Sequence, residues 1–127
     1  MLVAVAFASA LALFWPTLIQ GASGGVAPSE AVLLINREKA VLIDVCEPEE
    51  FAQCHAVGAK NIPLAQLEAQ LPLAVKNKSV PVILVCQSGG RASKAEAQAK
   101  KLGYERAHAM AGGLKAWREA SLPTEKA

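Results

Sequence analysis

The sequence contains little of what marks several large classes of protein. Its 127 residues include three phenylalanines, two tryptophans and one tyrosine, the net charge is only +2, and no basic run is interleaved with aromatic residues. A nucleic-acid-binding surface is therefore not expected. Charge is also absent from the beginning of the chain, because Glu30 is the first charged side chain. The mixed-charge remainder, roughly 95 residues, is long enough to bury a core without metals or disulfides.

Cysteine is scarce, and its spacing fits neither a metal site nor a disulfide framework. Cys46, Cys54 and Cys86 form an odd set without a CxxC pair. Cys54 is followed directly by His55, and neighbouring side chains in a strand or loop diverge, so these two residues make a poor zinc chelate. An odd, widely spaced set of cysteines fits a reducing compartment better. We therefore expect no metal site.

The uncharged head of the chain predicts a membrane segment. Residues 1–19 are mostly Ala, Leu, Val and Phe, and Trp15 and Pro16 lie near the end of this run. A helix of about 20 apolar residues can cross a bilayer, and aromatic residues are common at its interface. We expect residues 1–20 to form an apolar transmembrane helix, residues 21–27 a flexible linker, and residues 28–125 the folded domain.

Two other interpretations of the head remain open, a cleaved signal peptide and a poorly ordered leader. Against a signal peptide, no basic residue precedes the apolar run, and Gln20 interrupts the small-residue pattern that cleavage requires. For an anchor, the nearest positive charges are Arg37 and Lys39 on the carboxyl side, which favours a domain facing the cytoplasm. A cleaved signal would instead place the domain in the periplasm or outside the cell.

Beyond the head, helical and strand-like segments alternate, which predicts an α/β fold with a mostly parallel sheet. Short apolar runs indicate buried strands, and segments with apolar residues three or four apart indicate helices. Glu47, Glu49 and Glu50 are interpreted as a solvated helix start, and Leu114 and Trp117 as inward-facing. The expected strands cover residues 40–45, 56–63, 80–85 and 106–111, and the expected helices residues 28–39, 47–54, 65–71, 91–103 and 112–120.

The stretch VPVILVCQSGGRAS, residues 80–93, predicts the functional site. A buried strand ends at Cys86, a short loop follows, and Arg91 opens a helix. In parallel α/β folds, sites form where strands end and the next helices begin. Amides at a helix amino terminus, with Arg91 beside them, form an anion cradle that favours a Cys86 thiolate. The alternative is a structural cysteine at a strand end.

Three segments in order resemble the single-domain rhodaneses, the thiosulfate sulfurtransferase-like proteins. They are VLIDVCEPEEFAQCHAVGAKNIPL, VILVCQSGGRAS and AGGLKAWREASLP, within residues 28–125. The resemblance implies a rhodanese-like central parallel sheet of about five strands flanked by helices. It also implies sulfurtransfer from thiosulfate or a similar small anionic donor through a Cys86 persulfide to a thiophilic acceptor. That acceptor is cyanide in an assay, and a thiol or a protein in the cell.

The resemblance also assigns roles to individual residues. We expect no cofactor. Cys86 matches the family's nucleophile, and Arg91 matches the residue that closes the loop and would hold the donor. The loop whose amides hold the sulfur matches Gln87, Ser88, Gly89 and Gly90, and structural support is implied for Asp44 and His55.

Alternatives to turnover with thiosulfate remain. Only four residues separate Cys86 from Arg91, and Val85 precedes the cysteine, which disfavours the phosphatases that carry a His-Cys pair and a longer loop. A rhodanese-like sulfur-relay or partner-binding module at a membrane fits the same residues. Cys46 and Cys54 stand where the family usually has Arg and Gly, so they are either small buried side chains or thiols that react with Cys86, including in a redox sensor.

Overall fold

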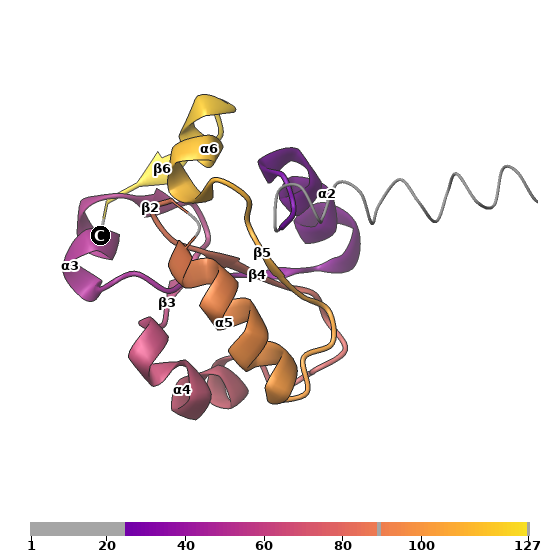
Figure 1. Cartoon of the computed structure of the whole chain (residues 1–127). Coiled ribbons are helices and arrows are strands. Elements are labelled where there is room, and N and C mark those ends of the chain that lie inside the picture. Colours follow the sequence, from indigo (N-terminus) through magenta and orange to yellow (C-terminus); the bar gives the residue numbers. More distant parts are fainter. Residues whose placement is uncertain (1–24, 89, 127) are drawn as a thin grey trace, which may run out of the picture.

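The structure is a computed structural model that describes residues 25–88 and 90–126. The expected membrane segment, residues 1–20, lies outside this part, and within it no helix is long and apolar enough to cross a bilayer. The elements, shown in Figure 1, are α2 (Pro28–Glu38), β1 (Val41–Asp44), α3 (Pro48–Gln53), β2 (His55–Ala56), β3 (Lys60–Asn61), the 3-10 helix η1 (Leu64–Gln66), α4 (Leu67–Ala74), β4 (Val82–Val85), α5 (Gly90–Lys101), β5 (Ala107–Ala109), α6 (Gly113–Glu119) and β6 (Thr124–Glu125).

The central sheet has the strand order β3-β1-β4-β5, and every neighbouring pair is parallel. An isolated parallel bridge between Val26 and Met110 extends the sheet beyond β5. Within the described residues, the central sheet therefore has four strands and a bridge where about five strands were expected. The α/β alternation and the parallel sheet are confirmed.

One expected strand is divided in the structure. The predicted strand at residues 56–63 becomes β2 and β3, which are separated by a turn that contains Gly58 at φ 88°. β3 joins the central sheet, whereas β2 pairs antiparallel with β6. The prediction was wrong here because the local sequence does not reveal that the two ends of this segment pair with different strands.

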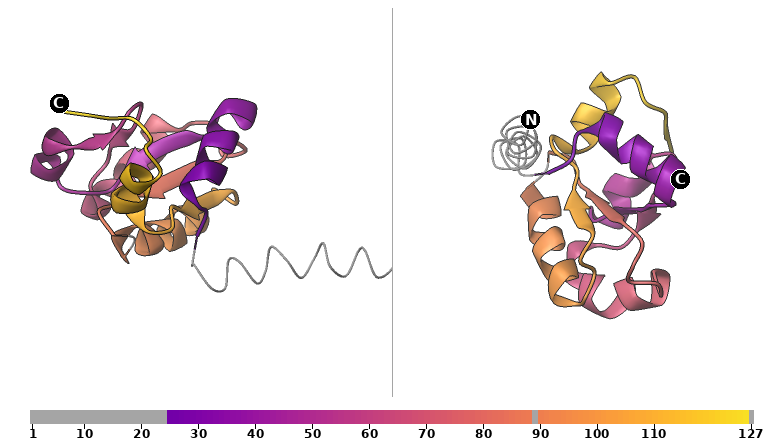
Figure 2. Two further views of the ribbon diagram at one scale, coloured as in Figure 1. Left: turned by 90° about the horizontal axis from the view of Figure 1, so that it is seen from above. Right: turned by 90° about the vertical axis from the view of Figure 1, so that its right-hand side faces the viewer.

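Helices cover both faces of the sheet, with α4 and α5 on one side and α2 and α6 on the other (Figures 1 and 2). Successive strand residues point to opposite faces, so Ile43 packs with the α4 and α5 side and Leu42 with the α2 and α6 side. Burial on both faces explains the continuous apolar runs of β1 and β4. Leu114 and Trp117 of α6 are buried, as predicted.

Helix α5 packs through small side chains. Ala92, Ala95 and Ala99 are fully buried, and the charged residues of the helix lie on its other face. Alanine lets a helix approach the sheet closely at little cost in side-chain entropy. This packing brings the first turn of α5 next to the end of β4.

The sheet register brings the ends of β1 and β4 together. Asp44 is the register partner of Val85, and the Val45 N–H donates to the Val85 carbonyl oxygen over 2.9 Å. The residues that follow these strands, Cys46 and Cys86, therefore leave the sheet at the same edge.

Candidate active site

Cys86 lies directly after β4 and points to the first turn of α5. The residue is buried, with 1% of its surface exposed. The backbone N–H of Ala92 donates to Cys86 Sγ over 3.4 Å. Helix α5 has 12 residues, so its dipole also directs positive potential at this end. An amide donor and a helix amino terminus both stabilise negative charge on the sulfur.

The back of the Cys86 loop is held by α6. The Leu114 N–H donates to the Cys86 carbonyl oxygen over 2.7 Å, and the Lys115 N–H donates to the Gln87 carbonyl oxygen over 3.3 Å. Gly113 makes this approach possible, because a Cβ at that position would lie 2.4 Å from the Cys86 carbonyl oxygen. Gly113 also has φ +60°, a region that favours glycine. Sequence analysis did not identify this role, although two glycines before a helix were the available signal.

Of the predicted loop, Gln87 and Ser88 lie between β4 and α5, whereas Gly90 is already the first residue of α5. Gln87 is half-buried and Ser88 is exposed, and Gly89 lies outside the described residues. Gly90 begins α5, its φ is not positive, and an added Cβ would meet no atom within 4 Å. The structure therefore gives no backbone reason for glycine at position 90.

Arg91 makes two hydrogen bonds with a carboxylate from another element. Its Nη1 and Nη2 atoms donate to Oε1 and Oε2 of Glu50 in α3 over 2.7 Å and 3.0 Å. These bonds hold the pKa of Glu50 at about 2, and they raise the pKa of Arg91. Glu50 lies in the first turn of α3, as predicted, and it is partly exposed. Its pairing with Arg91 was not predicted, because Arg91 lies 41 positions away and local sequence gives no sign of the pair.

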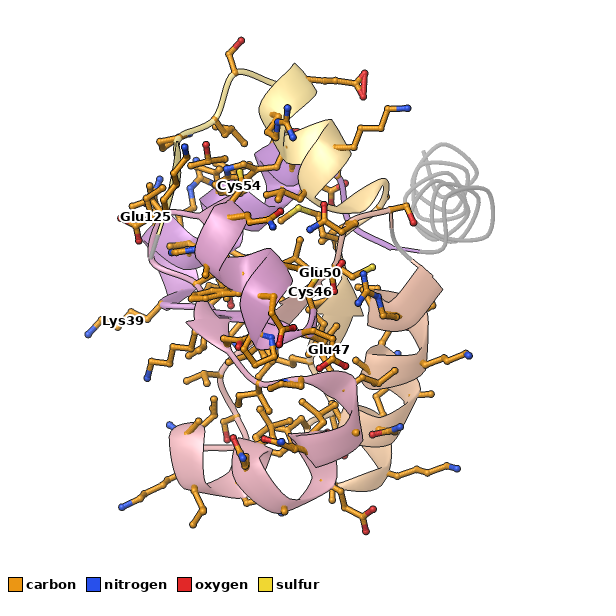
Figure 3. The ribbon with its side chains drawn as sticks, turned by 90° about the vertical axis from the view of Figure 1, so that its left-hand side faces the viewer. Lys39, Cys46, Glu47, Glu50, Cys54 and Glu125 are labelled. Carbon is orange, nitrogen blue, oxygen red and sulfur yellow. The ribbon has the colours of Figure 1, made fainter. Side chains whose placement is uncertain are left out.

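The second thiol at this edge has different surroundings. Cys46 is buried, and its backbone N–H donates to Asp44 Oδ1 over 2.8 Å. Burial raises the pKa of the Cys46 thiol to about 12, and the Asp44 carboxyl adds to this effect, whereas Arg91 opposes it. Figure 3 shows Cys46 and Glu50 near each other, with Cys54 apart from them. Cys46 is therefore held as a neutral thiol.

Asp44 and His55 make contacts that tie loops together. Asp44 is buried, burial raises its pKa, and its backbone oxygen accepts from Asn61 Nδ2 over 3.1 Å. His55 Nδ1 donates to the Phe51 carbonyl oxygen over 2.8 Å, and its Nε2 lies 3.1 Å from Glu125 Oε1. The ring of His55 also stacks on Phe51. Both residues therefore contact neighbouring loops, and their supporting role at the site stays a prediction.

Cys54 lies on the other side of the sheet from the two strand-end cysteines. It is half-buried and packs with the α2 and α6 side, whereas Cys46 and Cys86 belong to the α4 and α5 side. Its φ of −168° is extended, which any residue adopts, so the cysteine causes no backbone strain here. None of the three cysteines forms a disulfide.

Comparisons with known proteins agree with this fold. A family model described as a rhodanese-like domain matches residues 27–120. The chain is 37% identical over 102 residues to the uncharacterized protein slr1261 of Synechocystis, covering 80% of this chain and 55% of that one. It is 37% identical over 73 residues to thiosulfate sulfurtransferase PspE of Escherichia coli, covering 58% and 69% of the two chains.

A solved structure of a related protein has the same fold. The human single-domain sulfurtransferase TSTD1 superposes with a TM-score of 0.68 at 32% identity, covering 75% of this chain and 95% of that one. The chain spans about half the length of the Synechocystis relative, so relatives can carry segments that this alignment does not reach. The match over residues 27–120 includes both strand-end cysteines, Arg91 and Glu50. The chain belongs to the rhodanese-like domain family.

Proposed function

We propose that the chain is a sulfurtransferase of the thiosulfate sulfurtransferase type, in which Cys86 carries the sulfur as a persulfide. The observation that carries the proposal is the placement of Cys86 Sγ at the start of α5, where the Ala92 N–H donates to it. Family membership and relatives named as thiosulfate sulfurtransferases support the same chemistry. The backbone of Gln87, Ser88, Gly89 and Gly90 would surround the transferred sulfur.

The reaction would proceed in two displacement steps. The Cys86 thiolate attacks the outer sulfur of thiosulfate, the S–S bond of the donor breaks, and sulfite leaves with the electron pair. The acceptor, cyanide in an assay or a thiol or protein in the cell, then attacks the outer sulfur of the persulfide. The Cys86 thiolate leaves and is ready for another cycle. Neither step requires a cofactor or a general base.

A second candidate is a relay module that accepts sulfur from a dedicated partner and turns over poorly with thiosulfate. The ion pair between Arg91 and Glu50 favours it, because a cation already paired with a carboxylate attracts a dianionic donor less strongly. A redox sensor that uses a Cys46–Cys86 disulfide is less well supported. The raised pKa of Cys46 makes its thiol a weak nucleophile near neutral pH.

We also propose that the uncharged head anchors the protein in a membrane with the domain on the cytoplasmic side. The support is the apolar run of residues 1–19 and the positive charges of Arg37 and Lys39 after it. Extraction of membranes with carbonate, and protease treatment of sealed vesicles, test attachment and side. Release of the protein by carbonate would contradict the anchor.

The intact mass of the full chain after thiosulfate treatment tests the proposed chemistry. A gain of about 32 Da, absent from the Cys86→Ala variant and reversed by cyanide with release of thiocyanate, is expected for a persulfide on Cys86. Steady-state turnover then separates the enzyme from the relay. A folded protein with an unmodified Cys86 thiol after treatment would contradict sulfur transfer from thiosulfate.

A further inference from the structure

The ion pair between Arg91 and Glu50 lies near the Cys46 and Cys86 thiols. The Arg91 guanidinium is close enough to the Cys46 and Cys86 thiols for electrostatic interaction with both. Arg91 follows the Cys86 loop in sequence, whereas Glu50 comes from α3, which follows β1. The two charged side chains therefore join the segments that leave the neighbouring strands β1 and β4.

Glu50 is held in place by its own helix as well as by Arg91. Its Oε1 atom accepts the backbone N–H of Glu47 over 3.0 Å, which forms the capping box at the start of α3. Two charge-assisted hydrogen bonds in a fork geometry fix the guanidinium plane. The depressed pKa of Glu50 keeps its carboxylate ionised at neutral pH. The negative charge is thus a fixed feature of the site.

The fixed carboxylate reduces the net positive charge that a sulfur donor meets at Arg91. An unpaired guanidinium attracts a dianion about twice as strongly as it attracts a monoanion at the same distance. The ion pair of a guanidinium and a carboxylate has no net charge. Its net charge therefore attracts a dianionic donor no more strongly than a monoanionic one. Hydrogen bonding by the remaining guanidinium N–H groups is possible with both donors.

We infer that Glu50 determines donor specificity: by neutralising Arg91 it lowers the preference of the Cys86 site for dianionic thiosulfate and favours persulfides of thiols, which carry less charge. The inference rests on the proposed function. With such a donor, the Cys86 thiolate attacks the outer sulfur of R–S–SH, the S–S bond of the donor breaks, and the thiolate R–S⁻ leaves. Cys86 then holds the outer sulfur as Cys86–S–SH.

The variant Glu50→Gln tests the charge with little change of shape. The glutamine side-chain oxygen can still accept from Arg91 or from the Glu47 N–H, but the negative charge is gone. Glu49→Gln is the matched control, because Glu49 is exposed, lies in the same helical turn and loses the same charge. Circular dichroism checks that parent and variants are folded.

The measurement is kcat/KM for loading Cys86, with thiosulfate and with the singly charged persulfide of N-acetylcysteinamide. We expect Glu50→Gln to raise the thiosulfate-to-persulfide ratio by about five- to tenfold, and Glu49→Gln to change it by less than about twofold. High salt should shrink the difference, since it screens charges at an open site. An unchanged ratio in Glu50→Gln would overturn the inference.

Alkylation of Cys86 gives a readout that does not depend on sulfur transfer. Anionic iodoacetate and neutral iodoacetamide react at the same sulfur, and mass spectrometry of the Cys86 peptide separates its modification from that of Cys46 and Cys54. Glu50→Gln should raise the iodoacetate-to-iodoacetamide rate ratio by about fivefold. Equal changes for both reagents would show that Glu50 only positions Arg91. If the parent accepts sulfur from neither donor, the proposed function fails, and the alkylation ratio still decides whether Glu50 selects by charge.

Discussion

The neighbouring strands β1 and β4 both lead into a buried cysteine at the same edge of the sheet. The two thiols nevertheless have different neighbours, an N–H donor at Cys86 and a carboxyl group at Cys46. The Cys86 sulfur accepts the N–H of Ala92, which stabilises a negative charge. Cys46 lies beside the Asp44 carboxyl, and burial and this carboxyl raise its pKa to about 12. Position at the carboxyl edge of a parallel sheet therefore does not suffice to make a cysteine reactive.

The segments that follow β1 and β4 account for the different surroundings of the two cysteines. After β4 the chain passes directly into α5, so helix amides are directed at Cys86. After β1 it passes into α3, and the Cys46 backbone N–H is bound by the carboxyl of Asp44, two residues earlier. The Arg91–Glu50 ion pair connects the two segments. Four experiments test this contrast.

The largest expected effect comes from exchanging each thiol for a hydroxyl. Cys86→Ser should lower sulfur loading by at least about 10³-fold, whereas Cys46→Ser should stay within about threefold of the parent. Intact mass after treatment with a sulfur donor measures both. A comparable loss in the two variants would mean that Cys46 takes part in the transfer.

Gly113→Ala should disrupt the backbone of Cys86 and Gln87 while leaving the segment around Cys46 in place. The new Cβ would lie 2.4 Å from the Cys86 carbonyl oxygen at a backbone φ of +60°. We expect a loss of about 2–4 kcal/mol in the free energy of unfolding, together with slower sulfur loading. Gly90→Ala is the control, because its Cβ enters open space and should cost within about 0.5 kcal/mol. Chemical denaturation compares the two, and equal stabilities would contradict the close contact of α6 with the loop.

Asp44→Asn should make Cys46 more reactive. Removing the carboxylate takes away one cause of the raised Cys46 pKa, but burial, the larger cause, remains. At pH 9 the rate of Cys46 alkylation by iodoacetamide should rise about tenfold, which corresponds to a fall of about one pKa unit. The Cys86 rate in the same sample is the internal reference. A parallel rise at both cysteines would indicate loosening of the fold.

Glu50→Gln should have the smallest effect, a loss of stability that depends on pH. The pKa of Glu50 is depressed in the folded protein, so its contribution is present above the ordinary value of 4.5 and is lost as the pH falls toward about 2. Because both side chains are about one third exposed, we expect a difference of about 1 kcal/mol between parent and variant at pH 7 that shrinks at pH 3. Urea denaturation at the two pH values measures it. A constant difference would exclude the charge as its cause.

Local sequence patterns predicted most of the fold, because helices and buried strands depend on residues close together in the chain. The predicted strand at 80–85 and helix at 91–103 correspond to β4 and α5, and the junction between them placed Cys86 at the edge of the sheet. Long-range pairs were not predictable in this way. Glu50 has the appearance of any acidic residue in a first helical turn, and its bond to Arg91 depends on how α3 and α5 are arranged by the sheet.

The division of residues 56–63 into two strands has the same cause. β2 pairs with β6 through the contact of His55 with Glu125, 70 residues later, and no local pattern connects these two segments. The role of Gly113 was likewise hidden, because a close approach between α6 and the Cys86 loop depends on tertiary packing. Most helices and buried strands could thus be predicted from the sequence, whereas the pairing of distant segments depends on the fold.

The short bridge at Val26 has a consequence for how the protein behaves in concentrated solution. Along the edge strand β5 and just beyond it, the outward amides are occupied, that of Ala107 by the Tyr104 carbonyl oxygen, that of Ala109 by the Glu96 carboxylate, and that of Ala111 by the Val26 carbonyl oxygen. A strand edge whose amides are occupied offers fewer hydrogen-bond donors to a second chain. A shortened protein that begins after Val26 would uncover part of this edge, and we expect it to self-associate as its concentration rises, which sedimentation would reveal.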